Sequence, residues 1–370
     1  MKIRLLQDHL RSGGTERQTL LLARAFAEAG HATEIVTFRP GGALADTASV
    51  PVRCLQPFDT KLNGFAPGLV RTLRAAAPDV VLCMGRMANC HAGRVARALP
   101  ATIVVGTMRT GKPLPWFFRR SLRQVAHVVA NSAESAHGLT HIHGLPPDRV
   151  SVIHNALVFP PADAAPARDD ALRARFGAGP GTCVLLCVGM FRPEKNQRAL
   201  IRIAAALGRD ADWQLWLAGD GPERTDCEAL AARLGVADRV KFPSFVADPT
   251  PLYRAADLAV LASQAESLSN FLIEAQAHGL PAVACAAGGV AECLRDGVSG
   301  HVVSPGDDAA FLAALRPLMA DAGLRERAGQ AARTFARDAF APERQARAYL
   351  DLFARLLAAN PLEAPPRARA

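Results

Sequence analysis

The sequence of 370 residues lacks any apolar run that approaches the roughly 18 residues of a membrane span. Its first residues, 1–6, indicate a short strand and lack the long apolar region of a signal peptide. Eight cysteines are scattered along the chain without CxxC or Cys/His metal-ligand spacing. We therefore expect a cytoplasmic protein with reduced cysteines.

Two common nucleotide-binding motifs are also missing. The sequence has neither the GxGxxG order of a dinucleotide fold nor the GxxxxGK[ST] of a P-loop. It shows no RNA- or DNA-binding motif, so we expect no nucleic-acid partner.

The net charge of +9 is unevenly distributed. Residues 1–150 carry 19 Lys and Arg against 9 Asp and Glu, whereas residues 151–370 carry 24 against 25. This surplus predicts an anionic partner for the first half of the chain. An anionic membrane surface is one candidate, which would place the protein peripherally at the inner face of the cell membrane.

The densest basic and aromatic segment lies within this first half. Its aromatic residues adjoin arginines, as in interfacial membrane anchors. The alternative is a core-facing aromatic cluster beside a solvated basic face. The candidate membrane-contact residues are Trp116, Phe117, Arg119, Arg120 and Arg123.

Apolar, β-branched runs alternate with Ala-, Leu- and Arg-rich stretches, which predicts parallel sheets covered by helices. The fold class is α/β, with two Rossmann-like, doubly wound domains that face a cleft. We expect these domains at residues 1–160 and 171–338, joined by a linker at 161–170. A helix over 339–360 and a disordered tail over 361–370 complete the chain.

The expected strands follow the apolar runs. In the first domain they lie at residues 3–6, 32–37, 80–83, 103–106, 127–130 and 151–155, with helices that include 16–29 and 93–98. In the second domain they lie at residues 182–188, 213–218, 240–242, 258–261, 282–285 and 300–303.

Two glutamates, Glu266 and Glu274, lie eight residues apart around a predicted helix start. Loop and capping residues precede Asn270, and helix-forming residues follow it. The amides of Asn270, Phe271 and Leu272 are therefore expected at a helix N-terminus, where a diphosphate can bind. For an isolated pair at this spacing, a surface helix with solvated glutamates is the commoner explanation.

Basic and glycine-rich loops follow two of the expected strands. Arg192 and Lys195 lie after the strand at 182–188, where two cations stabilise the charge of a departing diphosphate. Gly13 and Gly14 follow the first strand and permit close approach of the backbone to a phosphate or sugar. Each signal is weak by itself.

Several segments occur in one order along the chain: Gly13-Gly14-x-Glu16, residues 188–196, residues 217–222, Glu266-x7-Glu274 and residues 288–292. Together they resemble glycosyltransferase family 4. The resemblance covers nearly the whole chain and implies a GT-B fold, with a C-terminal helix that crosses back to the N-terminal domain. It also implies an enzyme that retains anomeric configuration and uses no metal or other cofactor.

By this resemblance, Glu274 binds the ribose hydroxyls of the donor and Glu266 the hydroxyls of its sugar. Arg192 and Lys195 bind the diphosphate. Gly13, Gly14 and Gly189 are further donor-binding residues. Two positions depart from the family pattern. Met190 stands where many members have arginine. Arg109 stands in the loop where others place a histidine, so it contacts the acceptor or sugar, or is a structural residue held by a salt bridge.

The expected reaction moves a sugar from a nucleoside-diphosphate sugar, with a UDP-sugar as the expected donor, to an acceptor hydroxyl. The acceptor is a glycan or a lipid-linked molecule of lipopolysaccharide, capsule, exopolysaccharide or glycolipid synthesis. The alternative is a catalytically inactive, membrane-docked binding subunit of a polysaccharide assembly complex.

Overall fold

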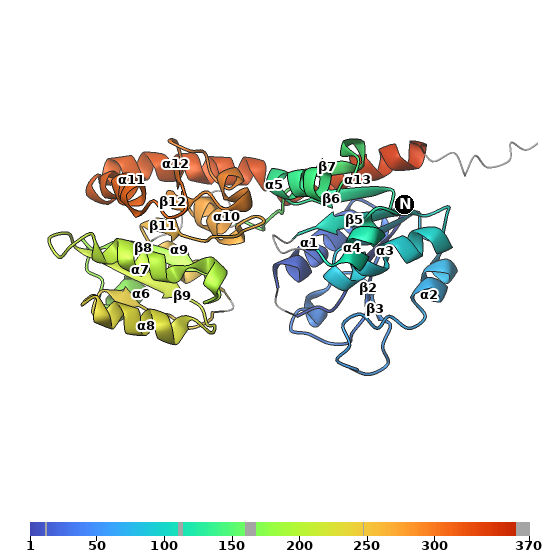
Figure 1. The fold of residues 1–370 in the computed structure, drawn as a ribbon, viewed down its shortest axis with the longest axis horizontal. Coiled ribbons are helices and arrows are strands. Elements are labelled where there is room, and N and C mark those ends of the chain that lie inside the picture. Colours follow the sequence, from blue (N-terminus) through green and yellow to red (C-terminus); the bar gives the residue numbers. More distant parts are fainter. Residues whose placement is uncertain (12, 110–113, 160–167, 247, 360–370) are drawn as a thin grey trace, which may run out of the picture. The chain divides into compact units, whose positions relative to one another are not determined.

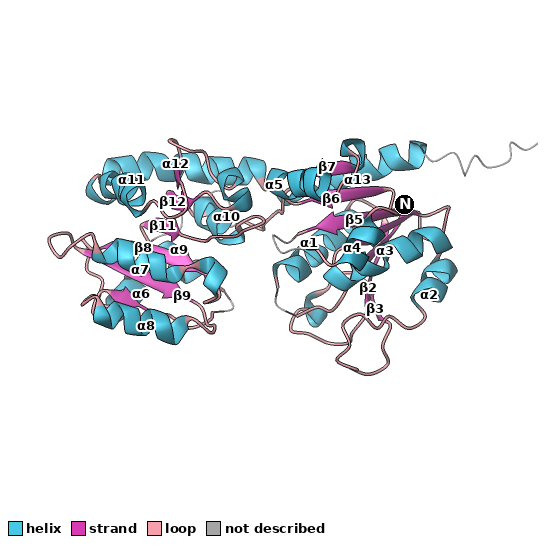
Figure 2. Ribbon diagram, in the orientation of Figure 1, coloured by secondary structure: helices cyan, strands magenta, loops and turns pink. Residues whose placement is uncertain are grey.

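The computed structural model describes residues 1–11, 13–109, 114–159, 168–246 and 248–359. The chain divides into two compact units, Met1–Ala156 with the segment from Pro342 onward, and Leu157–Ala341. Each unit is a parallel β-sheet covered by helices (Figures 1 and 2), which confirms the predicted α/β class. No helix in the described ranges has the length and apolar character that crossing a membrane requires.

The first unit contains a seven-stranded parallel sheet in the order β3-β2-β1-β4-β5-β6-β7. Its central strands are buried because their apolar runs face helices on both sides. The strands are β1 Lys2–Gln7, β2 Ala32–Thr37, β3 Val52–Cys54, β4 Val80–Cys83, β5 Ile103–Met108, β6 His127–Ala130 and β7 Val150–Val152.

Two sets of helices cover this sheet. Helices α1 (Gly14–Glu28) and α13 (Pro342–Ala359) pack together on one face, where Phe26 contacts Tyr349 and Phe353. Helices on the other face form a separate core with Leu73, Val95 and Phe118. These are α2 Leu69–Ala76, α3 Arg86–Ala98, α4 Trp116–Leu122 and α5 Ala133–His137, with short turns η1 Ala45–Thr47, η2 Gly138–Ile142 and η3 Pro147–Arg149.

The second unit contains a six-stranded parallel sheet in the order β10-β9-β8-β11-β12-β13. Strands β8 and β11 are neighbours at its centre, so the loops after them emerge side by side at the same edge. The strands are β8 Cys183–Val188, β9 Trp213–Ala218, β10 Val240–Lys241, β11 Leu258–Leu261, β12 Ala282–Cys285 and β13 Gly300–Val303.

Seven helices cover the described part of this second sheet and form one continuous core with it. They are α6 Asp170–Arg175, α7 Gln197–Ala205, α8 Arg224–Arg233, α9 Thr250–Ala255, α10 Asn270–Ala277, α11 Asp308–Ala320 and α12 Ala322–Ala339. Two short turns, η4 Pro193–Lys195 and η5 Gly288–Glu292, lie in loops at the carboxyl ends of β8 and β12.

The boundary between the units differs from the expected one. Leu157 and Phe159 pack against the core of the second unit, and the Leu157 N–H donates to the Phe340 carbonyl at 3.2 Å. The division therefore falls after Ala156 and again before Pro342, instead of at 160 and 338. Most of the expected linker, at 161–167, and the expected tail, at 361–370, lie outside the described residues.

Candidate functional site

The candidate site lies in the second unit, where the loops after β8 and β11 meet. The Gln264 N–H donates to the Glu194 carbonyl at 2.8 Å and joins the two loops through their backbones. The Lys195 Nζ and the Glu266 Oε1 lie 2.5 Å apart. The structure thus brings together two residues that the sequence predicts for the same ligand, one for its diphosphate and one for its sugar.

Glu266 is held on a second side by Ser263. The Ser263 Oγ donates to the same Oε1 atom at 2.9 Å, and Ser263 is fully buried. The side chain of Glu266 is 9% exposed and that of Lys195 is 29% exposed. Glu266 is therefore fixed in position, with one carboxylate oxygen engaged by two donors.

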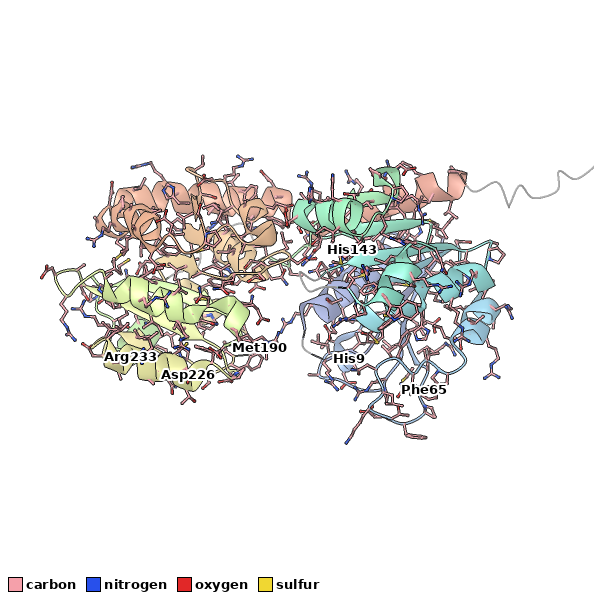
Figure 3. The ribbon with its side chains drawn as sticks, viewed as in Figure 1. His9, Phe65, His143, Met190, Asp226 and Arg233 are labelled. Carbon is pink, nitrogen blue, oxygen red and sulfur yellow. The ribbon has the colours of Figure 1, made fainter. Side chains whose placement is uncertain are left out.

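Arg192 and Met190 lie on the outer side of the loop after β8. The Arg192 side chain is 44% exposed, and its Nη1 lies 3.9 Å from the Glu194 Oε1. Met190, which Figure 3 labels, is 51% exposed. Arg192 is thus the more accessible of the two predicted diphosphate-binding cations, and Lys195 is the one held by Glu266.

Glycines allow a second loop to support the loop after β8. At Gly219, where φ is +139°, a Cβ would lie 2.3 Å from the Gly189 carbonyl oxygen. At Gly221 a Cβ would lie 2.4 Å from the Phe191 carbonyl oxygen. The Gly189 N–H donates to the Ala218 carbonyl at 2.9 Å, so this amide is occupied within the unit. The space beside the Gly189 Cα is open within the described residues.

Gly288 supports the loop that carries Glu266. It has a φ of +55°, and a Cβ there would lie 1.8 Å from the Glu266 carbonyl oxygen. Only glycine allows the turn after β12 to pass this close to the Glu266 backbone. This packing is a role that the sequence did not reveal.

Helix α10 begins at Asn270, as predicted, with Ser269 as its N-cap. The Ser269 Oγ accepts from the Leu272 N–H at 3.4 Å. The Leu272 amide therefore donates to its own cap residue, and its contact with the donor stays a prediction. Phe271 contributes a buried ring, which is 8% exposed.

Glu274 lies on the second turn of α10 and has a buried partner. The Tyr253 hydroxyl donates to the Glu274 Oε2 at 2.6 Å, and Tyr253 is 2% exposed. The Tyr253 ring stacks on the His278 ring at 4.8 Å between centroids. Burial, followed by the nearby Glu274 carboxylate, raises the pKa of Tyr253 well above its ordinary value, so the hydroxyl remains a donor. Sequence reasoning missed Tyr253, which lies on α9.

Gly13 and Gly14 lie in the first unit, at the start of α1. Gly13 caps the helix, and a Cβ there would lie 2.4 Å from the Glu16 Oε2. The Glu16 Oε1 lies 3.2 Å from the His9 Nδ1. Gly13 therefore gives room to the Glu16 side chain, which folds back over the turn.

Arg109 is bound within the first unit. Its Nη1 donates to the Asn155 Oδ1 at 2.5 Å, and its Nη2 donates to the Tyr349 hydroxyl at 3.0 Å. These bonds link the end of β5 to α13. They favour the structural alternative for Arg109, and both of these partners are neutral.

The basic aromatic segment combines both of its predicted alternatives. Phe118 faces the core, whereas Trp116 is 65% exposed and Phe117 is 43% exposed. Arg119, Arg120 and Arg123 are also exposed. Helix α4 therefore presents two aromatic rings and a basic surface outward.

Comparisons with known proteins agree with this architecture. Residues 182–321 match the model described as glycosyl transferases group 1, and residues 12–157 match the model described as glycosyltransferase family 4. Anabaena Alr3699/HepE, solved in complex with UDP, superposes with a TM-score of 0.82 at 22% identity, covering 96% of this chain and all of the other. The fold is that of the GT-B glycosyltransferases.

Curated relatives extend this likeness to the sequence. The D-inositol 3-phosphate glycosyltransferase of Mycobacterium sp. (strain KMS) is 30% identical over 341 residues, which covers 83% of this chain and 74% of the relative. The D-inositol 3-phosphate glycosyltransferase 2 of Catenulispora acidiphila is 39% identical over 207 residues, covering 51% of this chain and 47% of the relative. This chain belongs to glycosyltransferase family 4 and is a glycosyltransferase.

Proposed function

We propose that the enzyme transfers a sugar from a nucleoside diphosphate to an acceptor hydroxyl, with UDP as the nucleotide, retention of configuration and no metal. The observation that carries this proposal is the placement of Lys195 and Glu266 at the adjoining carboxyl ends of β8 and β11, with Glu274 on the following helix. The UDP and UDP-glucose complexes of the HepE structural neighbour support the choice of nucleotide.

Each residue has a distinct part in this scheme. Glu274 accepts hydrogen bonds from the ribose hydroxyls, and Glu266 accepts from the hydroxyls of the sugar. Arg192 and Lys195 stabilise the negative charge that grows on the diphosphate as its bond to the sugar breaks. Gly13, Gly14 and the amides of Asn270 and Phe271 complete the donor contacts.

The proposed reaction needs no protein nucleophile. The bond between the sugar C1 and the phosphate oxygen breaks, and the acceptor oxygen bonds to C1 on the same face. The acceptor proton passes to the departing phosphate, which leaves as the nucleoside diphosphate. The protein orients the reactants and stabilises charge.

We propose an acceptor at a membrane surface, in a cell-envelope glycan or glycolipid, for a cytoplasmic enzyme that binds the membrane peripherally. The exposed rings and arginines of α4 support this choice. The alternative expected from the sequence was an inactive binding subunit, and membership of a glycosyltransferase family argues against it. The binding subunit predicts nucleotide binding without any turnover, whereas the enzyme also hydrolyses its donor slowly in the absence of acceptor.

The first test is a thermal-shift screen against UDP, GDP and ADP and their sugar conjugates, with and without EDTA. A ligand that binds the native state raises the melting temperature by mass action. We expect a shift with UDP and a UDP-sugar that EDTA leaves unchanged and that Glu274→Ala abolishes. Glu326→Ala, an exposed glutamate on α12, is the control.

The second test measures donor hydrolysis and transfer in Glu266→Ala and Lys195→Ala. Removal of one charged group that stabilises a transition state costs about 10²–10³ in rate. We expect losses of this order in both variants. Near-normal turnover in either variant would contradict the role of that residue, and no hydrolysis by the parent protein would favour the binding subunit.

A further inference from the structure

A loop after β3 in the first unit exposes large apolar side chains from a fixed backbone. Buried Gln56 organises this loop: its Nε2 donates to the Leu62 carbonyl at 3.1 Å and to the Phe65 carbonyl at 2.6 Å. Figure 3 marks Phe65 on this loop. The exposed fractions are 69% for Phe58, 62% for Leu62 and 46% for Phe65.

The buried side chain of Arg39 also holds this loop in place. The Arg39 Nε and Nη2 each donate to one oxygen of Asp59 at 2.7 Å, and Arg39 is 6% exposed. These hydrogen bonds lower the pKa of Asp59 to about 2, so the pair stays charged at neutral pH. The loop is thus held in a conformation that leaves large apolar side chains in contact with water, which is typical of interaction surfaces.

Helix α3 lies between this loop and α4. On one side, the His91 Nε2 lies 2.9 Å from the Gly64 carbonyl oxygen. On the other side, the Gly93 N–H donates to the Ser121 Oγ at 2.8 Å. Helix α3 follows β4 and α4 follows β5, and these strands are parallel neighbours, so the two helices run in the same direction. Trp116, at the start of α4, therefore lies beside the first half of α3. The apolar groups therefore flank α3 on both sides.

Helices α2, α3 and α4 on this face carry charge of one sign, whereas α5, on the same face, contains the exposed Glu134. No aspartate or glutamate occurs in α2, α3 or α4. Their arginines are exposed, and none forms an ion pair with a described carboxylate. They are Arg71 and Arg74 on α2, Arg86, Arg94 and Arg97 on α3, and Arg119 and Arg120 on α4.

The opposite face of the sheet has a different composition. Helix α1 contains Glu16 and Glu28 among its arginines, and α13 contains Glu343 and Asp351. The surplus of positive charge in the first half of the chain is thus gathered on the face of α2, α3 and α4. An anionic surface would meet arginines without neighbouring acidic residues along α2, α3 and α4.

We propose that this face, bounded by the loop at 56–65 and by α4, is the surface on which the protein docks to an anionic lipid bilayer. The apolar side chains of the loop and of α4 enter the interfacial region, and the arginines between them contact lipid phosphates. This inference deepens the membrane partner in the proposed function, because it assigns that contact to a whole face of the first unit instead of to α4 alone.

The arrangement favours a bilayer over a soluble polyanion. Each flank of the basic strip carries side chains that gain from leaving water, and Leu62 has no ring with which to stack on a base. Amphipathic surfaces of this composition bind membranes through apolar burial and attraction to anionic lipids together. A soluble polyanion would use the arginines and leave the apolar residues in water.

The test is flotation of the full-length protein with vesicles of phosphatidylcholine alone and with added phosphatidylglycerol. We expect binding that rises with the anionic lipid and falls with salt. Each arginine near an anionic surface contributes about fivefold to binding. The triple variant Arg86→Ser/Arg94→Ser/Arg119→Ser should therefore bind up to about a hundredfold more weakly.

A second variant, Phe58→Ser/Phe65→Ser, tests the apolar flank on the loop. We expect weaker binding to anionic vesicles and unchanged binding to dextran sulfate, a soluble polyanion. The control is Arg175→Ser/Arg233→Ser/Arg327→Ser, which removes the same charge from exposed positions of the second unit. This control should bind vesicles as the parent protein does.

The outcomes separate this inference from the donor chemistry. A preserved thermal shift with UDP shows that each variant is folded and that the donor site is intact. Equal vesicle binding by the parent and both variants would overturn the docking face, as would binding to dextran sulfate without binding to vesicles. Absence of a UDP shift in the parent would instead count against the proposed function.

Discussion

Removal of one buried hydroxyl, in Tyr253→Phe, tests how the enzyme holds its nucleotide. The Tyr253 hydroxyl donates to the Glu274 Oε2 at 2.6 Å, while the ring stacks on His278 and Phe271. Phenylalanine keeps the ring and its packing but loses the donor. The substitution therefore removes this hydrogen bond to the Glu274 carboxylate without opening a large cavity.

The structure sets the size of the effect. A hydrogen bond to a charged group contributes about 1.5–3 kcal/mol, so the variant should unfold more easily by about this amount. If Glu274 binds the ribose, nucleotide binding to the variant must also order the Glu274 side chain. In the parent protein, Tyr253 already holds this side chain before the nucleotide binds. Ordering one side chain costs about 0.5–1.5 kcal/mol, which weakens nucleotide binding about 2- to 12-fold.

The assay compares calorimetric affinities for UDP and for 2′,3′-dideoxy-UDP, which lacks the ribose hydroxyls. We expect Tyr253→Phe to weaken UDP binding and to leave dideoxy-UDP binding nearly unchanged. Tyr349→Phe removes another buried hydroxyl, in the first unit, and should change neither affinity. Equal weakening for both nucleotides would refute positioning through Glu274, and unchanged UDP affinity would refute the ribose contact itself.

Two further predictions concern the scaffold. Gly288→Ala should lower the unfolding free energy by several kcal/mol and reduce donor hydrolysis, because its Cβ would meet the Glu266 carbonyl oxygen at 1.8 Å. Gly297→Ala is the control, because Gly297 has a φ of +72° in open space and the variant shows only the cost of a side chain at a positive φ. Equal free energies of unfolding of the two variants in urea would contradict the packing role of Gly288. Burial lowers the pKa of His127 to about 4. In the unfolded chain the pKa of this histidine is near 6.5, so the unfolded chain binds the proton first as the pH falls. The free energy of unfolding of the first unit should therefore decrease by at most about 3 kcal/mol between about pH 6.5 and pH 4. In His127→Gln, this part of the pH dependence should disappear from urea unfolding curves, and an unchanged profile would count against it.

Strand positions could be predicted from the sequence because the strands are buried apolar runs. The runs at Ala32–Thr37, Trp213–Ala218 and Ala282–Cys285 match their strands at both ends. Strand β3 was missed because Val52–Cys54 is a three-residue edge strand in which every residue is exposed, so no apolar pattern marks it. A pattern of apolar residues indicates a buried strand, and an exposed edge strand has no such pattern.

Helix α3 shows a different limit. The sequence predicted its start at residue 93, but it begins at Arg86. The Asp8 carboxylate accepts from the Met87 and Ala88 N–H groups at 3.0 and 2.9 Å. This cap comes from the end of β1, far away in the sequence, so no local capping signal precedes the helix. A start fixed by tertiary contact is invisible to a search for local caps.

The same distinction applies to the candidate site. Ser263 lies three residues before Glu266, and Ser269 three before Leu272, so both contacts could have been inferred from local spacing. Tyr253 lies 21 residues before Glu274 and reaches it only because α9 and α10 pack in one core. No spacing rule connects these two residues.

The pairing of Lys195 with Glu266 follows from strand order. Seventy-one residues separate them, yet β8 and β11 are neighbours, and their loops leave the sheet at one edge. The sequence identified both residues as ligand contacts but assigned them to separate parts of the donor. The Lys195 ammonium group and the Glu266 carboxylate interact strongly because they are so close. A diphosphate that approaches Lys195 must therefore interact with an ammonium group that is already paired with Glu266. Charge on the leaving group is thereby coupled to the position of the carboxylate proposed to hold the sugar, which links the two halves of the donor through one contact.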